Sequence, residues 1–120
     1  MNQIETLDFV HLHVHSEYSL VDGIIRIEDL IDHSVNLGYH SVALTDLTNL
    51  FGLIEFYRSA RKKGIKPIVG SEINVSKDKD SIAAPLVLLA ANKQGYINLT
   101  KLVSKAYVEG QINGEPTVLF

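Results

Sequence analysis

The stretch that decides the fold is the N-terminal run Phe9-Val10-His11-Leu12-His13-Val14-His15. Histidines alternate here with apolar residues, which is the two-residue period of a β-strand, so we expect a strand from Phe9 to Val14. Its three imidazoles then project from one face and its aliphatic side chains from the other. Three stacked imidazoles on one strand face indicate that a metal ion, a phosphate or a hydrogen-bond network lies beside them.

Two helices and a second strand follow this run. Apolar residues at helical spacing predict a helix that begins at Ile27 and stops at Gly38. A short buried strand over 41–45 then ends at Asp46. A second helix follows, for which Thr48 or Asn49 is the expected N-cap; its expected apolar stripe is Leu53, Ile54, Tyr57 and Ala60.

The second half of the chain repeats the alternation. We expect an extended segment over 67–75, an exposed loop over 76–85 with alternating charges, and a further strand over 86–91. A helix over 92–109 comes next, with Leu99, Leu102, Val103 and Ala106 as its apolar stripe. The last residues, 116–120, are apolar and resemble the start of another element.

Strands that alternate with helices at this spacing predict an α/β fold with parallel pairing. Four strands are too few for the usual eight-stranded barrel. We therefore expect residues 1–120 to be the N-terminal portion of a larger domain, incomplete at its C-terminus. Such a piece would leave strand edges and an apolar face uncovered, so alone it should self-associate or be unstable.

Composition narrows the function classes. The chain has no cysteine, so any metal must be bound by His, Asp or Glu. A net charge of -3 gives no electrostatic footprint for nucleic-acid binding by this segment alone. Because neither a membrane span nor a signal peptide is recognisable, we expect a soluble, cytoplasmic protein.

The candidate site follows from the expected topology. Functional groups of parallel α/β folds gather at the C-terminal ends of the strands, which here carry His13, His15, Asp46 and Glu72. Asp22, in the loop after the first strand, can reach the same rim. Imidazoles and carboxylates suit zinc, manganese or iron, and two or three such ions would clamp a phosphate ester and activate water. The alternative for each carboxylate is that it caps backbone groups at a strand end.

The same residues carry a resemblance to a known family. The stretch 9–19 followed by Asp22-Gly23 is similar to the opening of the PHP (polymerase and histidinol phosphatase) domain of bacterial DNA polymerase III α subunits, of the proteobacterial type. Further matches, in the same order along nearly the whole chain, are Ala43-Leu44-Thr45-Asp46, Asn49-Leu50-Phe51-Gly52, Phe56-Tyr57, Gly64-Ile65-Lys66-Pro67-Ile68-Val69-Gly70, Leu89-Ala90-Ala91-Asn92, Gly95-Tyr96 and Asn98-Leu99.

This resemblance implies the first half of a distorted (β/α)7 barrel whose rim, in active relatives, binds three metals and hydrolyses phosphoesters. Ligand positions of the family fall on four residues of this chain, His13, His15, Asp22 and Glu72. Two further ligand positions are lost, because Leu47 stands where active relatives have a histidine after the aspartate, and Pro85 stands where another histidine is common. The resemblance therefore implies a partial, vestigial metal site with residual zinc or manganese at most, and no catalytic residue in this segment.

Three functions are compatible with these features. The first is the N-terminal PHP segment of a replicative DNA polymerase, a structural part that docks the proofreading exonuclease ε subunit; the rest of the polymerase chain would supply the magnesium site and the DNA contacts. The second is an active metal-dependent phosphoesterase or 3′–5′ exonuclease. The third is a free-standing subunit-binding module without chemistry.

Overall fold

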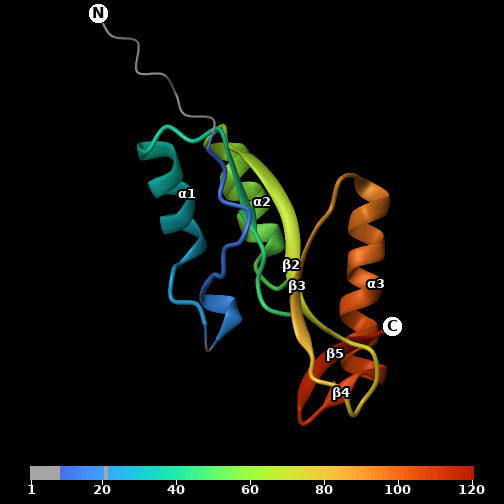
Figure 1. The fold of residues 1–120 in the computed structure, drawn as a ribbon. Helices are drawn as coiled ribbons and strands as arrows, with labels where there is room; N and C mark the ends of the chain where they lie inside the picture. The colour runs from blue at the N-terminus through green and yellow to red at the C-terminus, as the bar shows by residue number, and fades with distance from the viewer. Residues whose placement is uncertain (1–8, 21) are drawn as a thin grey trace, which may run out of the picture.

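Helices flank a five-stranded sheet in the computed structural model of the chain, which describes residues 9–20 and 22–120 (Figure 1). Helices α1 and α2 lie to the left of the long β2 strand in this view, and α3 lies to its right. In chain order the elements are η1 (Glu17–Ser19, a 3-10 helix), α1 (Ile27–Asn36), β1 (Ser41–Leu44), α2 (Leu53–Lys62), β2 (Lys66–Ser76), β3 (Ala84–Leu89), α3 (Lys93–Glu109), β4 (Gln111–Ile112) and β5 (Glu115–Leu119).

The histidine-rich segment runs beside β1 but is not a regular strand, so the strand predicted from Phe9 to Val14 is wrong in detail. Two backbone hydrogen bonds join the segments, from the Ala43 N–H to the His11 carbonyl (3.0 Å) and from the Thr45 N–H to the Val14 carbonyl (2.9 Å). The Val14 N–H, however, donates to the Thr45 hydroxyl (2.8 Å) instead of a backbone carbonyl. A side chain thus replaces a ladder partner and interrupts the strand pairing.

Strand β2 is the centre of the sheet. It pairs in parallel with β1 through residues 66–69 and with β5 through residues 74–76, as the alternation of strands and helices predicts. Strand β3 pairs with β2 antiparallel, which corrects the expectation of parallel pairing throughout. The reason is the connection: residues 77–83 form a loop too short for a parallel crossover, which needs a dozen residues or more.

Helices α1 and α2 pack together over β1 and form the first hydrophobic core. Its fully buried members include Ile27 and Ile31 of α1, Val42 of β1, and Phe56 and Ala60 of α2. The helix α1 was predicted with nearly its observed bounds. Gly38 follows it with φ +78°, a left-handed conformation that glycine adopts without steric cost.

Helix α2 differs from its prediction in two respects. Its N-cap is Gly52, because Thr48 and Asn49 lie in the preceding loop, where the Thr48 N–H donates to the Glu72 carbonyl (2.7 Å). Its buried residues are Leu53, Phe56 and Ala60, whereas the predicted stripe members Ile54 and Tyr57 are exposed.

Helix α3 and the C-terminal strands form a second core against the far half of β2. Leu99 and Val103 of α3 are buried there beside Ile73. The predicted start is confirmed, because the Asn92 side chain caps the helix by accepting from the Gly95 N–H (2.9 Å). The apolar element expected over 116–120 is β5. Within the part of the chain that the structure describes, none of the helices combines the length and apolar character that crossing a membrane requires.

Candidate metal centre

Three of the predicted ligands converge at one place. The donor atoms of His13, His15 and Glu72 all lie within 4.8 Å of one another. Glu72 Oε2 lies 3.3 Å from His13 Nε2 and 2.5 Å from His15 Nε2. His13 is exposed, His15 is half-buried and Glu72 is buried, so the cluster opens to solvent on the His13 side.

Two separate segments supply these ligands. The histidines come from the irregular segment before η1, and their rings meet edge to face with centroids 5.2 Å apart. Glu72 comes from the middle of β2, where it pairs in parallel with Leu47, just beyond the end of β1. The chain after β1 thus continues to pair with β2, and this pairing places Glu72 at the C-terminal end of β1. That end belongs to the rim where the sequence predicted the site.

The donor set fits a metal ion. Nε2 of His15 is buried and has no hydrogen-bond partner among the described residues. Glu72 Oε2 nevertheless lies only 2.5 Å away, so the imidazole and the carboxylate are in direct contact. A metal ion that both side chains ligate would give this nitrogen a partner. Two imidazoles and one carboxylate, with a further position open, are a donor set that zinc and manganese accept.

The other predicted rim residues lie outside this cluster. Asp22 is exposed, and no donor atom of it lies within the convergent group. His11 is also separate, because its ring packs edge to face against Phe9 and Tyr39. Asp46 is 1 % exposed, and its carboxylate accepts hydrogen bonds instead of facing the histidines, which agrees with the capping alternative.

Serines around Asp46 are the part of the site that the sequence did not reveal. Ser16 and Ser19 donate their hydroxyls to the Asp46 carboxylate, and Ser71 donates to the Asp46 carbonyl (2.8 Å). Ser16 also caps η1 by accepting from the Tyr18 N–H (3.2 Å). Serine at a helix start is a recognisable N-cap signal, but its second bond to a carboxylate 30 residues away is a tertiary contact.

Helix η1 is tied to α2 by a polar contact. The Tyr18 hydroxyl donates to Glu55 Oε2 (3.2 Å). This hydrogen bond and the negative charge of Glu55 raise the pKa of Tyr18, which stays protonated and keeps the contact.

Both family departures lie near the cluster in the sheet. Leu47 pairs directly with Glu72, and Pro85 of β3 pairs with Asn74, two residues along β2 from Glu72. Neither side chain has a metal-binding atom.

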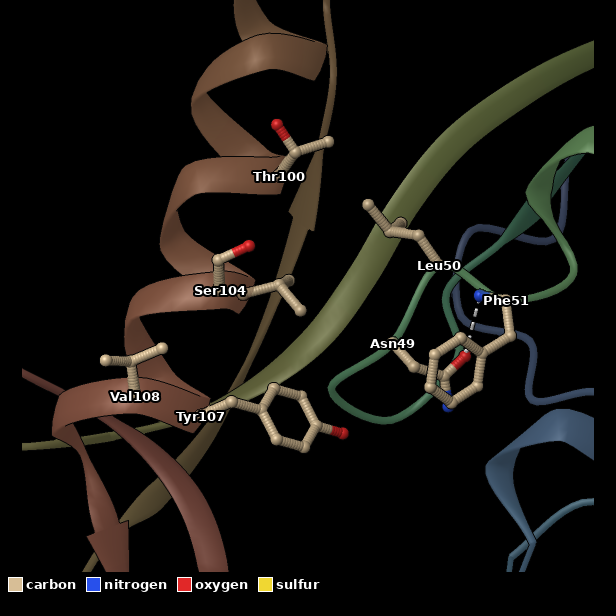
Figure 2. A pocket seen from close by; sticks show the side chains of 8 residues that line it. Asn49, Leu50, Phe51, Thr100, Ser104, Tyr107 and Val108 are labelled. Atoms are coloured by element: carbon tan, nitrogen blue, oxygen red, sulfur yellow. Dashed lines mark hydrogen bonds between the residues drawn. The ribbon is translucent and has the colours of Figure 1, made fainter.

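A separate hollow of about 490 Å³ lies between α3 and the loop before α2 (Figure 2). Figure 2 shows Thr100, Ser104 and Tyr107 of α3 on one side and Leu50 and Phe51 on the other. The residues that line it include no His, Asp, Glu, Lys or Arg. This hollow therefore lacks the kinds of side chain that converge in the histidine cluster.

Comparison with known proteins gives the family of the chain. The sequence model of the PHP domain matches residues 11–119. The chain belongs to the PHP family. The resemblance stated from its motifs is thus confirmed at the family level.

Curated relatives of this PHP chain are DNA polymerase III α subunits. It is 50 % identical over 105 residues to that of Buchnera aphidicola, 47 % over 111 residues to that of Pseudomonas aeruginosa and 49 % over 104 residues to that of Escherichia coli. These matches cover 86, 92 and 85 % of the chain but 9, 10 and 9 % of the relatives. The chain thus spans about a tenth of the length of these polymerase subunits.

Solved structures agree on the fold. A protein from Bifidobacterium adolescentis described as a metal-dependent phosphoesterase matches with a TM-score of 0.54 at 20 % identity, over 82 % of the chain and 33 % of that protein. An amidohydrolase from Chromobacterium violaceum, with bound sulfate and no metal, matches with a TM-score of 0.56 at 25 % identity, over 80 % of the chain and 33 % of that protein. These likenesses, together with the parallel pairing of β2 with β1 and β5, confirm the predicted α/β class with parallel strands.

Proposed function

We propose that this PHP chain is the N-terminal segment of the α subunit of a bacterial replicative DNA polymerase III. The observation that carries the proposal is its identity of 47–50 % to three such subunits over at least 85 % of its length. In this proposal residues 1–120 are the N-terminal portion of a PHP domain that continues after Phe120. The chain is then part of a DNA-directed DNA polymerase, although this segment does not itself join nucleotides.

The role proposed for the segment is structural. It supports the polymerase core and docks the proofreading exonuclease ε subunit, while DNA is bound by the full-length protein. Magnesium serves the polymerase site outside this segment. Replication takes place at the bacterial chromosome, so the proposal locates the protein in the cytoplasm.

A partial metal site is consistent with this structural role. His13, His15 and Glu72 lie together, and Asp22 is the fourth proposed ligand, although in the structure it lies outside their cluster. Leu47 provides no ligand where active relatives have one. We therefore propose a vestigial site that holds one zinc or manganese ion and performs no catalysis.

The gene and the full-length protein test this proposal. We expect the reading frame to continue past Phe120 for about nine times the length of this chain, because the chain covers about a tenth of its relatives. The purified product should extend a primed DNA template in the presence of magnesium and deoxynucleotides, and should retain the ε subunit in a pull-down. A reading frame that stops soon after Phe120, or a full-length product without primer extension, would contradict the proposal.

A second function is favoured by the convergence of the two histidines on Glu72. In this alternative the protein is an active metal-dependent phosphoesterase or 3′–5′ exonuclease of the PHP superfamily. A bound zinc or manganese ion would polarise the phosphate ester and activate water there. Within this chain, His13, His15 and Glu72 would hold the ion, and the solvent-exposed side at His13 would admit the phosphate.

Metal analysis of the protein with its complete PHP domain separates the two functions. An active enzyme should contain zinc or manganese and lose both the metal and the phosphoesterase activity in a His13→Ala/His15→Ala variant. The matched control is His33→Ala/His40→Ala, which removes two exposed histidines that belong to no convergent group. Bound metal without activity above background would favour the vestigial site, and activity that the histidine variant leaves unchanged would eliminate the enzymatic alternative.

A further inference from the structure

Asp46 is the most completely hydrogen-bonded buried carboxylate beside the histidine cluster. Its Oδ1 accepts from the Ser16 N–H (2.6 Å), the Ser16 hydroxyl (3.0 Å) and the Ser19 hydroxyl (2.8 Å). Its Oδ2 accepts from the Ser16 hydroxyl at 2.8 Å. Ser16 directly follows His15 in the chain. The Asp46 side chain therefore accepts hydrogen bonds from three donor groups, and two of these belong to Ser16, at the end of the histidine segment.

The backbone of Asp46 holds the opposite side of the cluster. The Glu72 N–H donates to the Asp46 carbonyl (3.0 Å), and the Ser71 hydroxyl donates to the same oxygen (2.8 Å). The next residue adds to the connection, because the Leu47 N–H donates to the Ser19 hydroxyl (3.0 Å). One residue thus contacts both segments that supply the candidate ligands.

We propose that Asp46 is a positioning residue that fixes the distance between the His13–His15 segment and Glu72 without itself being a ligand. The inference rests on the metal site of the proposed function. Its consequence is that metal affinity depends on a carboxylate whose two oxygens are occupied by serine donors.

A carboxylate at this position accepts from every group that approaches it. All the groups that approach the side chain are donors, two hydroxyls and one backbone N–H, and a carboxylate offers only acceptors. An asparagine of the same shape has no charge and only one acceptor oxygen, so its hydrogen bonds to these donors are weaker, and the Ser16 hydroxyl must accept from its NH₂ group instead of donating. Asp46→Asn therefore keeps the volume of the side chain and removes part of its attachment to Ser16 and Ser19.

The test compares Asp46→Asn with a matched control in the full-length protein. Asp78→Asn is the control, because Asp78 also accepts from a serine hydroxyl and two backbone N–H groups (Ser81 and Asp80), but in an exposed loop. These bonds lower the pKa of Asp78, so the control variant also replaces a hydrogen-bonded carboxylate. Zn²⁺ affinity is measured by chelator competition. The mobility of the backbone is measured by hydrogen–deuterium exchange of the metal-free protein.

We expect Asp46→Asn to weaken Zn²⁺ binding by about 10- to 100-fold, the usual effect of disturbing a residue that supports a ligand. Exchange should become faster in the peptide that covers residues 11–20, without metal present. The visible absorption of the Co²⁺-loaded protein should also change, because it reports ligand geometry. Asp78→Asn should leave all three measurements at wild-type values.

Ser16 provides a second variant in case Asp46→Asn does not fold. Ser16→Ala removes the hydroxyl donor but keeps the backbone bond to Asp46, and it should shift the same measurements in the same direction by a smaller factor. Ser16→Thr retains a hydroxyl and should restore them.

Each outcome gives a definite answer. Wild-type affinity and exchange in both Asp46→Asn and Ser16→Ala would overturn the positioning role. If the wild-type protein binds no metal but the variants exchange faster over 11–20, the metal site fails while the positioning of the segment by Asp46 is supported.

Discussion

His15 is the residue whose surroundings most directly favour the proposed metal site. Its Nε2 is buried and lies 2.5 Å from Glu72 Oε2, yet it has no hydrogen-bond partner among the described residues. Buried polar atoms are nearly always hydrogen-bonded, so an unpaired one usually has a functional reason. In the proposed function, a metal ion ligated by both side chains gives that reason.

Glu72→Gln tests this interpretation. The substitution preserves the shape of the side chain and the backbone pairing of β2, and it removes the charge that a cation requires. We expect the Zn²⁺ affinity of the complete PHP domain to fall by more than about 10-fold. Changing a residue that only supports a ligand usually costs about that much, and loss of a ligand should cost more. The circular dichroism spectrum should remain that of the wild type.

Glu55→Gln serves as the control for Glu72→Gln. Glu55 is exposed on α2 and accepts a hydrogen bond from Tyr18, away from the histidines. Equal losses of Zn²⁺ affinity in both variants, or none in Glu72→Gln, would exclude Glu72 as a ligand.

At the scale of secondary-structure elements, α2 shows why a helical period does not by itself identify the buried face. The alternative stripes share Leu53 and Ala60 and differ in whether Phe56, or Ile54 and Tyr57, face inward. The structure buries Phe56 completely against β1 and α1 and leaves Ile54 60 % exposed. Because Ile54 and Tyr57 on the exposed face are also large and apolar, the predicted stripe follows the helical period as well as the buried one does.

Alanine substitutions distinguish the two stripes. Phe56→Ala should lower the free energy of unfolding by about 3–5 kcal/mol, because it removes a fully buried aromatic ring and leaves a cavity. Ile54→Ala, at an exposed position of the same helix, should change it by about 0.5 kcal/mol or less. Thermal or urea unfolding of the complete PHP domain measures both, and a larger effect at Ile54 would contradict the observed burial.

The first turn of α3 offers a stabilising change. A Cβ at Gly95 would meet its nearest atom at 3.5 Å, an ordinary contact, and Gly95 has no positive φ. Gly95→Ala should therefore stabilise the complete domain by about 0.5–1 kcal/mol, because alanine loses less backbone entropy in a helix than glycine.

Asn92→Ala is the opposing control for Gly95→Ala in the same turn. It removes the N-cap bond to the Gly95 N–H and should cost about 1 kcal/mol. The same unfolding measurement applies, and a destabilised Gly95→Ala variant would show that the turn is tighter than its contacts indicate.

At the scale of the whole molecule, two cores share one strand. The first core joins α1, α2 and β1, and the second joins α3 to the far half of β2. Large apolar side chains remain exposed at several places around them, including Phe51, Val108 and Phe120. Phe51 and Val108 line the same hollow, and an exposed apolar patch of this kind favours association.

Residues 1–120 produced alone should therefore self-associate, at concentrations on the order of micromolar to millimolar. Sedimentation velocity should detect oligomers in a sample of residues 1–120 and none in a sample of the complete PHP domain. A stable monomer of residues 1–120 with a cooperative unfolding transition would contradict this expectation.

The sequence by itself determined the α/β class, most of the helix bounds and the family, and it predicted the three candidate ligands that converge. Hydrophobic periods, glycine stops and the His-x-His pattern are local, and each can be recognised within a few residues. The tertiary structure decided the rest. The antiparallel β3, the buried face of α2, the role of Asp46 and the position of Asp22 outside the cluster all depend on contacts between distant segments. The Ser16–Asp46 bond, for instance, joins residues 30 positions apart. No local pattern encodes such a partner, because the free energy of that contact arises only when the folded chain buries both groups together.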